Sequence, residues 1–238
     1  MSRGVGVTEA VREWVPEWTL EGFAVLSVFG DLLVIVPVLG VLYLVTVGRS
    51  LARGERDQPL CSDRTAVLIA VVFGGLALIV LLKAVFAFPR PPAEWHAIEP
   101  SEHGFPSGHT MAATVFWGAL AARFHLGDRA SRLAGAGLLV SLVALSRLAL
   151  GVHYLVDVLA SMAFGVVYLA GIAWLARGRP ERAFGIAIVI AVLAVVASNG
   201  SSRAVLALLG TVGGAVGWYV VERPVVRRRL VTLVQRVN

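Results

Sequence analysis

The sequence contains almost no lysine and almost no cysteine. Of its 21 basic residues, only Lys83 is a lysine, and Cys61 is the single cysteine. One cysteine excludes an intrachain disulfide and a cysteine-based metal site. Charged residues of both signs make up 15% of the chain, whereas soluble domains average about a quarter. The composition therefore argues against an ordinary water-soluble domain.

Long apolar runs take the place of the missing charge. Hydrophobic residues make up 58% of the chain, and the mean hydropathy is +0.81. Most of the runs reach the roughly 20 residues that a helix needs to cross a bilayer core. The seven runs are residues 24–47, 65–86, 107–124, 132–150, 153–176, 183–198 and 204–221. We expect an all-α, polytopic membrane helix bundle of about seven spans, in which the sixth run is short and has the least secure ends.

The positions of the arginines predict the orientation of this bundle. Fifteen arginines lie on alternate connections and in the C-terminal tail, whereas the opposite connections hold far fewer. The positive-inside rule therefore places the N-terminus outside and the C-terminus in the cytoplasm. We expect an outer segment over residues 1–22, which is either interfacial or a frayed terminus, a membrane domain over 23–222 and a basic cytoplasmic tail over 223–238. The same distribution explains the pI of about 10.4 without nucleic acid.

The lone lysine opens the first of three segments that carry chemistry. Lys83 lies near the outer end of the second apolar run, and Arg90 follows seven residues later between Pro89 and Pro91. The prolines stiffen the chain where it leaves the span. A lysine at this depth can also extend its ammonium to the interface without any further role.

The second segment is a Pro-Ser-Gly-His turn directly ahead of the third apolar run. Backbone N–H groups at a helix N-terminus are unpaired and attract anions. Gly108 would let a ligand approach the backbone closely. The simpler interpretation is that Ser107 caps the helix and His109 points at water.

The third segment runs from Ser146 to Asp157. Arg147 ends the fourth run, and His153 and Asp157 open the fifth with a spacing of four residues. That spacing places both side chains on one helix face, where a carboxylate can fix the imidazole tautomer and raise its basicity. Taken alone, a structural His–Asp pair would explain this spacing as well.

Alternating helix directions bring the three segments to one membrane boundary. The second and fourth spans end at the outer face, where the third and fifth begin. The orientation rests on other arginines, so this convergence is an independent check. Three cations, a helix N-terminus, two histidines and a carboxylate describe a phosphate site with a nucleophile and an acid.

These residues resemble the three-part signature of the type 2 phosphatidic acid phosphatase (PAP2) family. That family includes lipid phosphate phosphatases and undecaprenyl-diphosphate phosphatases, and shares its site with vanadium haloperoxidases and bacterial acid phosphatases. The motifs cover residues 83–157, about a third of the chain. They read Lys83-x6-Arg90-Pro91, Pro106-Ser107-Gly108-His109 and Ser146-Arg147-x5-His153-x3-Asp157. In one respect the chain departs from the family: only one span precedes the helix that carries Lys83.

The resemblance implies a role for each residue of the signature. His153 would attack phosphorus and form a phosphohistidine, Asp157 would orient it, and His109 would protonate the leaving group and then activate water. The implied phosphate-binding residues are Lys83, Arg90, Ser107, Gly108 and Arg147. The implied enzyme is a metal-independent, multi-pass phosphatase of the cell membrane. It would hydrolyse phosphatidic acid, another lipid phosphate or a polyprenyl diphosphate at the extracytoplasmic face.

Other interpretations of the sequence stay open. A lipid phosphotransferase would use the same phosphohistidine with a hydroxyl acceptor in place of water. An anion transporter would also place charges near span ends, although transporter sites usually lie at the midplane. The outer loop carries Glu94, Glu99 and Glu102 with two histidines, but no metal-ligand spacing. We therefore predict no metal or other cofactor.

One carboxylate lies inside an apolar run. Asp31 is about two turns from the outer end of the first run. A buried charge at this depth is costly and points to a function. Asp31 is therefore a candidate partner that supports an active-site cation from behind, or a polar bridge to the second span. A neutral, protonated Asp31 near the interface would also explain it.

Overall fold

The computed structural model describes residues 5–54, 57–100, 103–124 and 127–237. Glu102 of the outer loop lies outside these ranges. Within them the chain is all-helical and contains no strand, in agreement with the predicted fold class. The α-helices are α1 (Val5–Trp14), α2 (Leu20–Ser27), α3 (Leu32–Arg53), α4 (Asp63–Phe86), α5 (Gly108–Arg123), α6 (Arg129–Ala149), α7 (Leu155–Ala176), α8 (Pro180–Ala197), α9 (Ser202–Glu222) and α10 (Pro224–Val237).

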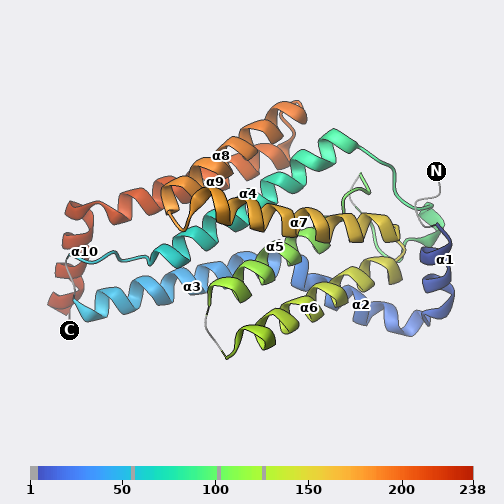
Figure 1. Ribbon diagram of the computed structural model, residues 1–238, viewed down its shortest axis with the longest axis horizontal. Coiled ribbons are helices and arrows are strands. Elements are labelled where there is room, and N and C mark those ends of the chain that lie inside the picture. Colours follow the sequence, from blue (N-terminus) through green and yellow to red (C-terminus); the bar gives the residue numbers. More distant parts are fainter. Residues whose placement is uncertain (1–4, 55–56, 101–102, 125–126, 238) are drawn as a thin grey trace.

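The long helices run back and forth along one axis (Figure 1). We call the end where α4 and α6 finish and α5 and α7 begin the site end. The N-terminal helix α1 lies at the site end, on the right of Figure 1, and the C-terminal helix α10 lies at the opposite end.

Six of the described helices are long and apolar enough to cross a membrane, one fewer than the predicted seven spans. The exception is α5, which has only 16 residues because it begins at Gly108 and ends at Arg123. Much of its surface is buried among neighbouring helices. The sixth apolar run, the least secure in the sequence, forms α8 with 18 residues.

The first apolar run does not form one continuous helix from residue 24. α2 ends at Ser27, a short 3-10 helix, η2, covers Val28–Gly30, and the spanning helix α3 begins only at Leu32. Asp31 separates them in an extended conformation, and its side chain accepts a hydrogen bond from the Leu33 N–H. An Asp in this position is a favourable helix N-cap, which explains why the run breaks there.

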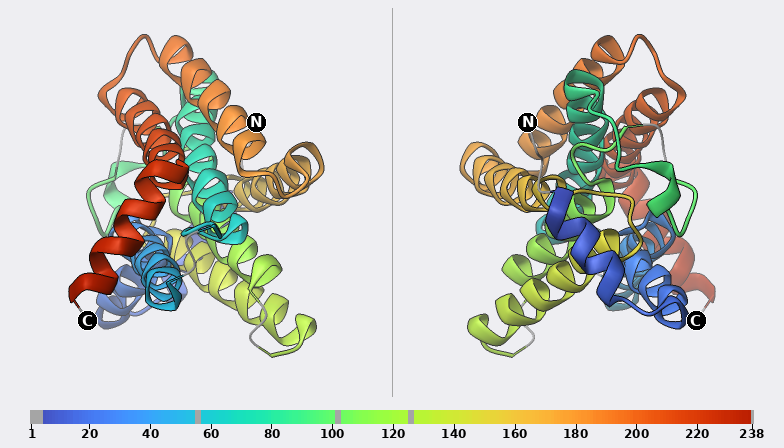
Figure 2. Two further views of the ribbon diagram at one scale, coloured as in Figure 1. Left: turned by 90° about the vertical axis from the view of Figure 1, so that its left-hand side faces the viewer. Right: turned by 90° about the vertical axis from the view of Figure 1, so that its right-hand side faces the viewer.

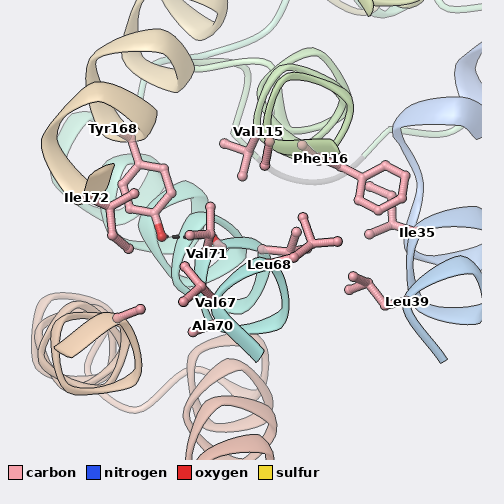
Figure 3. Close-up of a cluster of buried hydrophobic side chains, with 14 of the residues drawn as sticks. Ile35, Leu39, Val67, Leu68, Ala70, Val71, Val115, Phe116, Tyr168 and Ile172 are labelled. Carbon is pink, nitrogen blue, oxygen red and sulfur yellow. Dashed lines mark hydrogen bonds between the residues drawn. The ribbon is translucent and has the colours of Figure 1, made fainter. Parts of the chain in front are cut away.

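Helix α4 occupies the middle of the bundle. More than half of its most apolar 18 residues are buried, against 11% for α3 and for α9. Seen along the bundle axis, α6, α7 and the α8–α9 pair spread outward in different directions around it (Figure 2). Val67, Leu68 and Val71 of α4 belong to a buried cluster with side chains of α3, α5 and α7 (Figure 3). The Tyr168 hydroxyl of α7 donates to the Val71 carbonyl at 2.7 Å.

Small residues allow α4 and α8 to approach closely. A Cβ added at Gly74 would lie 2.5 Å from the Tyr168 hydroxyl and 2.9 Å from the Cβ of Ala187. Since helices in a membrane associate largely through close van der Waals packing, this contact matters for the stability of the bundle.

We predict that Gly74→Val destabilises the protein, because the new side chain must push α7 and α8 away from α4. The expected loss is about 1–3 kcal/mol in the free energy of unfolding. Gly171→Val in α7 is the matched control, because a Cβ there would meet nothing within 4 Å.

Thermal unfolding in detergent with a thiol-reactive fluorogenic dye would measure this loss. Cys61 is 1% exposed, and burial raises the pKa of its thiol to about 12, so the dye should react only after unfolding. A Gly74→Val protein that unfolds at the same temperature as the Gly171→Val protein would contradict the packing account.

Candidate active site

The connection that follows α4 folds over the site end on an aromatic cluster. The rings of Phe86, Phe88, Phe105 and Phe164 contact one another with centroids 5.0 to 6.2 Å apart. The Gly104 N–H donates to the Phe88 carbonyl at 2.9 Å, which closes the connection. Edge-to-face and offset ring contacts of this kind favour one fixed arrangement. The cluster therefore holds the segment that carries Arg90.

The segment from Leu150 to Tyr154 carries the predicted nucleophile and is held by the same connection. Gly151 has a φ of +69°, and a Cβ there would lie 2.0 Å from the Trp95 carbonyl oxygen. Only glycine fits this position without strain. The Ala97 N–H donates to the Leu150 carbonyl at 3.0 Å.

His153 is almost completely buried, at 1% exposure, between a carboxylate and a guanidinium. Its Nδ1 lies 3.4 Å from Oδ2 of Asp157, and its Nε2 lies 3.2 Å from Nη1 of Arg90. A guanidinium only donates hydrogen bonds, so Nε2 is the acceptor and the ring hydrogen sits on Nδ1, facing Asp157. The lone pair of Nε2 is thus presented beside Arg90.

Burial and charge keep this imidazole neutral. Desolvation is the largest cause, and the positive charges of Arg90 and Arg147 add to it, so the pKa of His153 is held well below its ordinary value. Burial likewise lowers the pKa of Arg90 to about 10, opposed by the Asp157 carboxylate and reinforced by Arg203. Arg90 still remains charged at neutral pH, and a neutral histidine is the form that can act as a nucleophile.

Asp157 is fully buried and has several backbone contacts. Its Oδ2 accepts from the Tyr154 N–H at 2.9 Å, and its carbonyl accepts from the Ser107 N–H at 3.3 Å. The bond to Tyr154 is part of a capping box at the start of α7. The first contact fixes the carboxylate at the start of α7, and the second joins the backbone of Asp157 to the Pro-Ser-Gly-His turn.

Ser107 lies behind the site and does not face the cavity. It is fully buried, and its hydroxyl lies 3.0 Å from the Thr110 hydroxyl. Ser107 occupies the N-cap position of α5, but its side chain makes no capping hydrogen bond. Two roles were considered for this hydroxyl, a helix cap and a phosphate contact. The structure does not show the cap, and the phosphate contact stays a prediction. Gly108 lines the cavity.

His109, on the first turn of α5, is hydrogen-bonded to the carboxylate that breaks the first apolar run. Its Nε2 lies 3.2 Å from Oδ2 of Asp31. The water-facing histidine considered from the sequence therefore has a protein partner. Asp31 thus contacts a histidine of the site, whereas the sequence led us to expect a cation or a bridge to the second span. Among the described residues, no hydrogen bond joins its side chain to α4.

Two further cations complete the site. Lys83 donates from Nζ to the His103 carbonyl at 2.8 Å. Arg147 is 3% exposed, and within the part of the chain that the structure describes its Nε and Nη1 are buried without a hydrogen-bond partner. A buried donor without a partner is costly, and a bound anion would satisfy it.

The site residues surround a cavity of about 710 Å³. This volume is in the range typical of small-molecule sites. Six of the eight predicted site residues line it, and Ser107 and Asp157 lie behind them. The six are Lys83, Arg90, Gly108, His109, Arg147 and His153.

The cavity continues from the charged end into an apolar groove between three helices. Its apolar lining comes from α3, α4 and α9. These side chains are Leu32, Val36, Phe73, Leu76, Ile79, Val80 and Leu206. α3 and α9 are the two spanning helices with the least buried surface, so the groove lies beside the part of the bundle most open to lipid.

Two elements at the site have no counterpart in the sequence-based prediction. The N-terminal helix α1 packs on the nucleophile segment: the buried Thr8 hydroxyl donates to the His153 carbonyl at 3.3 Å, and Arg12 donates to the Ala149 carbonyl at 3.2 Å. Arg203, at the start of α9, lines the cavity as a fourth cation. Nothing in the sequence beyond the residue types indicates either feature, because each depends on segments that are far apart in the chain and meet only in the fold.

Comparison with known proteins agrees with this geometry. The family model described as the PAP2 superfamily matches residues 64–182, half of the chain. A search of curated proteins found no match. The fold is similar to the crystal structure of a transmembrane PAP2-type phosphatidylglycerolphosphate phosphatase from Bacillus subtilis, with a TM-score of 0.55 and 23% sequence identity. That match covers 71% of this chain and 82% of the other.

The matched residues include the whole of the three-part signature and the four helices that carry it. The described helices also include six that are long and apolar enough to cross a membrane. The chain therefore belongs to the PAP2 superfamily and is a multi-pass membrane phosphatase of that family.

Proposed function

We propose that the protein hydrolyses the terminal phosphate of a lipid phosphate or a polyprenyl diphosphate at the extracytoplasmic face, through a phosphohistidine on His153. The observation that carries this proposal is the shape of the cavity. One end is lined by cations and two histidines, and the other is an apolar groove beside α3 and α9. A lipid phosphate has the same two parts, a charged headgroup and an apolar chain.

The cationic end suits a phosphoryl group in particular. Lys83, Arg90 and Arg147 all line it, and the N-terminus of α5 begins at Gly108 beside them. Guanidinium groups bind phosphate oxygens through paired hydrogen bonds. The two buried, unpartnered nitrogens of Arg147 would find acceptors in a bound phosphate. These groups would also stabilise the charge of the transition state.

The first chemical step would transfer the phosphoryl group to His153. The lone pair of Nε2 attacks phosphorus, and the bond from phosphorus to the leaving oxygen breaks. His109 gives its proton to that oxygen, which departs as an alcohol or a lipid monophosphate. Asp157 stabilises the positive charge that His153 gains, since the hydrogen on Nδ1 faces its carboxylate.

The second step would return His153 to its starting state. His109, now neutral, takes a proton from water as the water oxygen attacks phosphorus. The bond from phosphorus to Nε2 breaks, and inorganic phosphate leaves. Apart from the substrate and the attacking water, these steps use only side chains of the protein.

The proposed face follows from the charge distribution. Most arginines belong to connections at the end of the bundle opposite the site, together with the basic helix α10. Positive charge is retained on the cytoplasmic side during insertion, so the site end would lie outside.

We predict that purified protein in detergent releases phosphate from a lipid phosphate in the presence of EDTA, and that His153→Ala abolishes the release. Phosphatidic acid and a polyprenyl diphosphate should be assayed in parallel. Loss of the partner carboxylate in Asp157→Asn should lower turnover by up to about 10⁴-fold, as when an Asp that orients a catalytic histidine is replaced by Asn.

The outcome of this assay separates the proposed hydrolase from its alternatives. Release that persists in His153→Ala would contradict the proposal. Transfer to an added lipid or sugar alcohol without free phosphate would identify a phosphotransferase instead. Absence of both, with phosphate or organic anions crossing vesicles that contain the protein, would favour the transporter.

Arg203 gives a way to distinguish a diphosphate substrate from a monophosphate. It is exposed at the cavity rim, outside the three-part signature, and its charge acts on Lys83 and Arg90. If the natural substrate is a diphosphate, Arg203 would contact the phosphate that is not transferred. We predict that Arg203→Gln then lowers kcat/KM for a polyprenyl diphosphate by about tenfold, and much less for phosphatidic acid.

Arg129→Gln is the matched control for this substitution. Arg129 is also an exposed arginine in the first turn of a helix, α6, but lies at the end of that helix away from the site. Equal kcat/KM losses on the two lipids in Arg203→Gln would show that Arg203 attracts anionic substrates in general and does not select a diphosphate.

A further inference from the structure

A second histidine–carboxylate pair lies in the cavity, and only half of it belongs to the PAP2 signature. His109 is in the Pro-Ser-Gly-His motif, whereas Asp31 lies ahead of the residues that the family model matches. Nε2 of His109 and Oδ2 of Asp31 are 3.2 Å apart, and both residues line the cavity. This pair resembles the other histidine–carboxylate pair of the site, in which Asp157 contacts His153.

The two oxygens of Asp31 have different partners. Oδ1 accepts the Leu33 N–H at 2.8 Å and caps α3. Oδ2 is left for His109. Because the cap fixes the carboxylate to the start of a 22-residue helix, the position of Oδ2 is set by the scaffold and not by a flexible loop.

The segment ahead of Asp31 is docked directly on α5. A Cβ added at Gly30 would lie 2.3 Å from the His109 carbonyl oxygen, so the two backbones touch. Two turns further along α5, the Trp117 indole donates to the Phe29 carbonyl at 2.9 Å. These contacts hold η2 against α5 at two levels, which leaves Asp31 little freedom to move away from His109.

The charges around His109 explain why a carboxylate is useful there. A general acid must carry its proton before the leaving group departs. Burial is the largest influence that opposes a positive charge on the His109 ring, and Arg147 of α6 and Lys83 of α4 oppose it too. Asp31 is the carboxylate that acts on the ring from α3, and it favours the protonated form.

We propose that Asp31 is a positioning residue that holds a proton on Nε2 of His109 and stabilises the imidazolium, so that Nδ1 delivers the proton to the leaving oxygen. The proposal rests on the phosphatase function proposed above. In this step His109 begins with a hydrogen on each ring nitrogen. The hydrogen on Nδ1 goes to the leaving oxygen, and the hydrogen on Nε2 stays with Asp31.

The requirement for a leaving-group proton gives a specific test. An alkoxide leaving group needs protonation, whereas nitrophenolate is stable enough to leave without it. We would compare two substrates with the same alkyl chain, an alkyl phosphate and a nitrophenyl phosphate, and measure kcat/KM, which reports the first chemical step. Asp31→Asn and Asp31→Ser keep a residue that can cap α3 but remove the carboxylate. Asp31→Glu keeps the charge.

In Asp31→Asn and Asp31→Ser we expect kcat/KM for the alkyl phosphate to fall by about 10–100-fold. The value for the nitrophenyl phosphate should fall by less than about threefold, because that step depends little on an acid. Asp31→Glu should recover part of the loss on the alkyl phosphate. Asp128→Asn is the control, because Asp128 is also the N-cap of a helix, accepting the Ser131 N–H, but lies at the end of α6 away from the site. It should change neither value.

Three results would overturn the proposal. Equal losses on both substrates would show that Asp31 acts only by shaping the fold, and unchanged values on both would show no role. A gain on both would show that the carboxylate merely repels the phosphate. Failure of the function itself would look different: wild-type protein would hydrolyse neither substrate, or His153→Ala would retain its activity.

Discussion

The site depends on burying positive charge around an imidazole that must stay neutral. Lys83, Arg90 and Arg147 lie around one cavity, and their charges all disfavour protonation of His153. Such a cluster is costly in an empty pocket, because like charges repel and two nitrogens of Arg147 have no partner among the described residues. A bound phosphate would relieve both costs. Substrate binding would therefore recover the free energy that the folded protein loses by burying these charges. The rest of the fold must hold the cluster in place.

Three separate parts of the chain share that task. The connection after α4 fixes Gly151 and Leu150 through Trp95 and Ala97. The N-terminal helix α1 and the start of α7 add contacts to the same segment from other directions. His109 is held in a comparable way, because η2 docks on α5 and α3 begins with its carboxylate partner. Both histidines are thus positioned by elements outside their own helices, which limits their motion in the manner that preorganised catalysis requires.

Much of this arrangement could be predicted from the sequence, because it depends on run length and spacing. Apolar runs predicted the long helices, and their alternating direction brought Lys83, His109 and His153 to one end. The sequence could not predict contacts between segments that are far apart in the chain and share no motif. One example is the hydrogen bond from the Thr8 hydroxyl to the His153 carbonyl. The break at Asp31 was also missed, because an apolar run with one carboxylate has the same periodicity whether or not that residue caps a helix. The hydrogen bond from the Leu33 N–H and the extended backbone of Asp31 distinguish the two cases, and both are seen only in the structure.

The most direct test of this account is to trap the covalent intermediate. The protein would be mixed with a lipid labelled in its terminal phosphate and quenched in alkali, because phosphohistidine is unstable in acid, and the label would then be located by mass spectrometry. The account predicts a phosphoryl group on His153, and more of it in His109→Ala when the substrate has a nitrophenolate leaving group, since hydrolysis of the intermediate needs His109 as a base. A phosphoryl group on another residue, or rapid turnover with no labelled protein at any time, would contradict it.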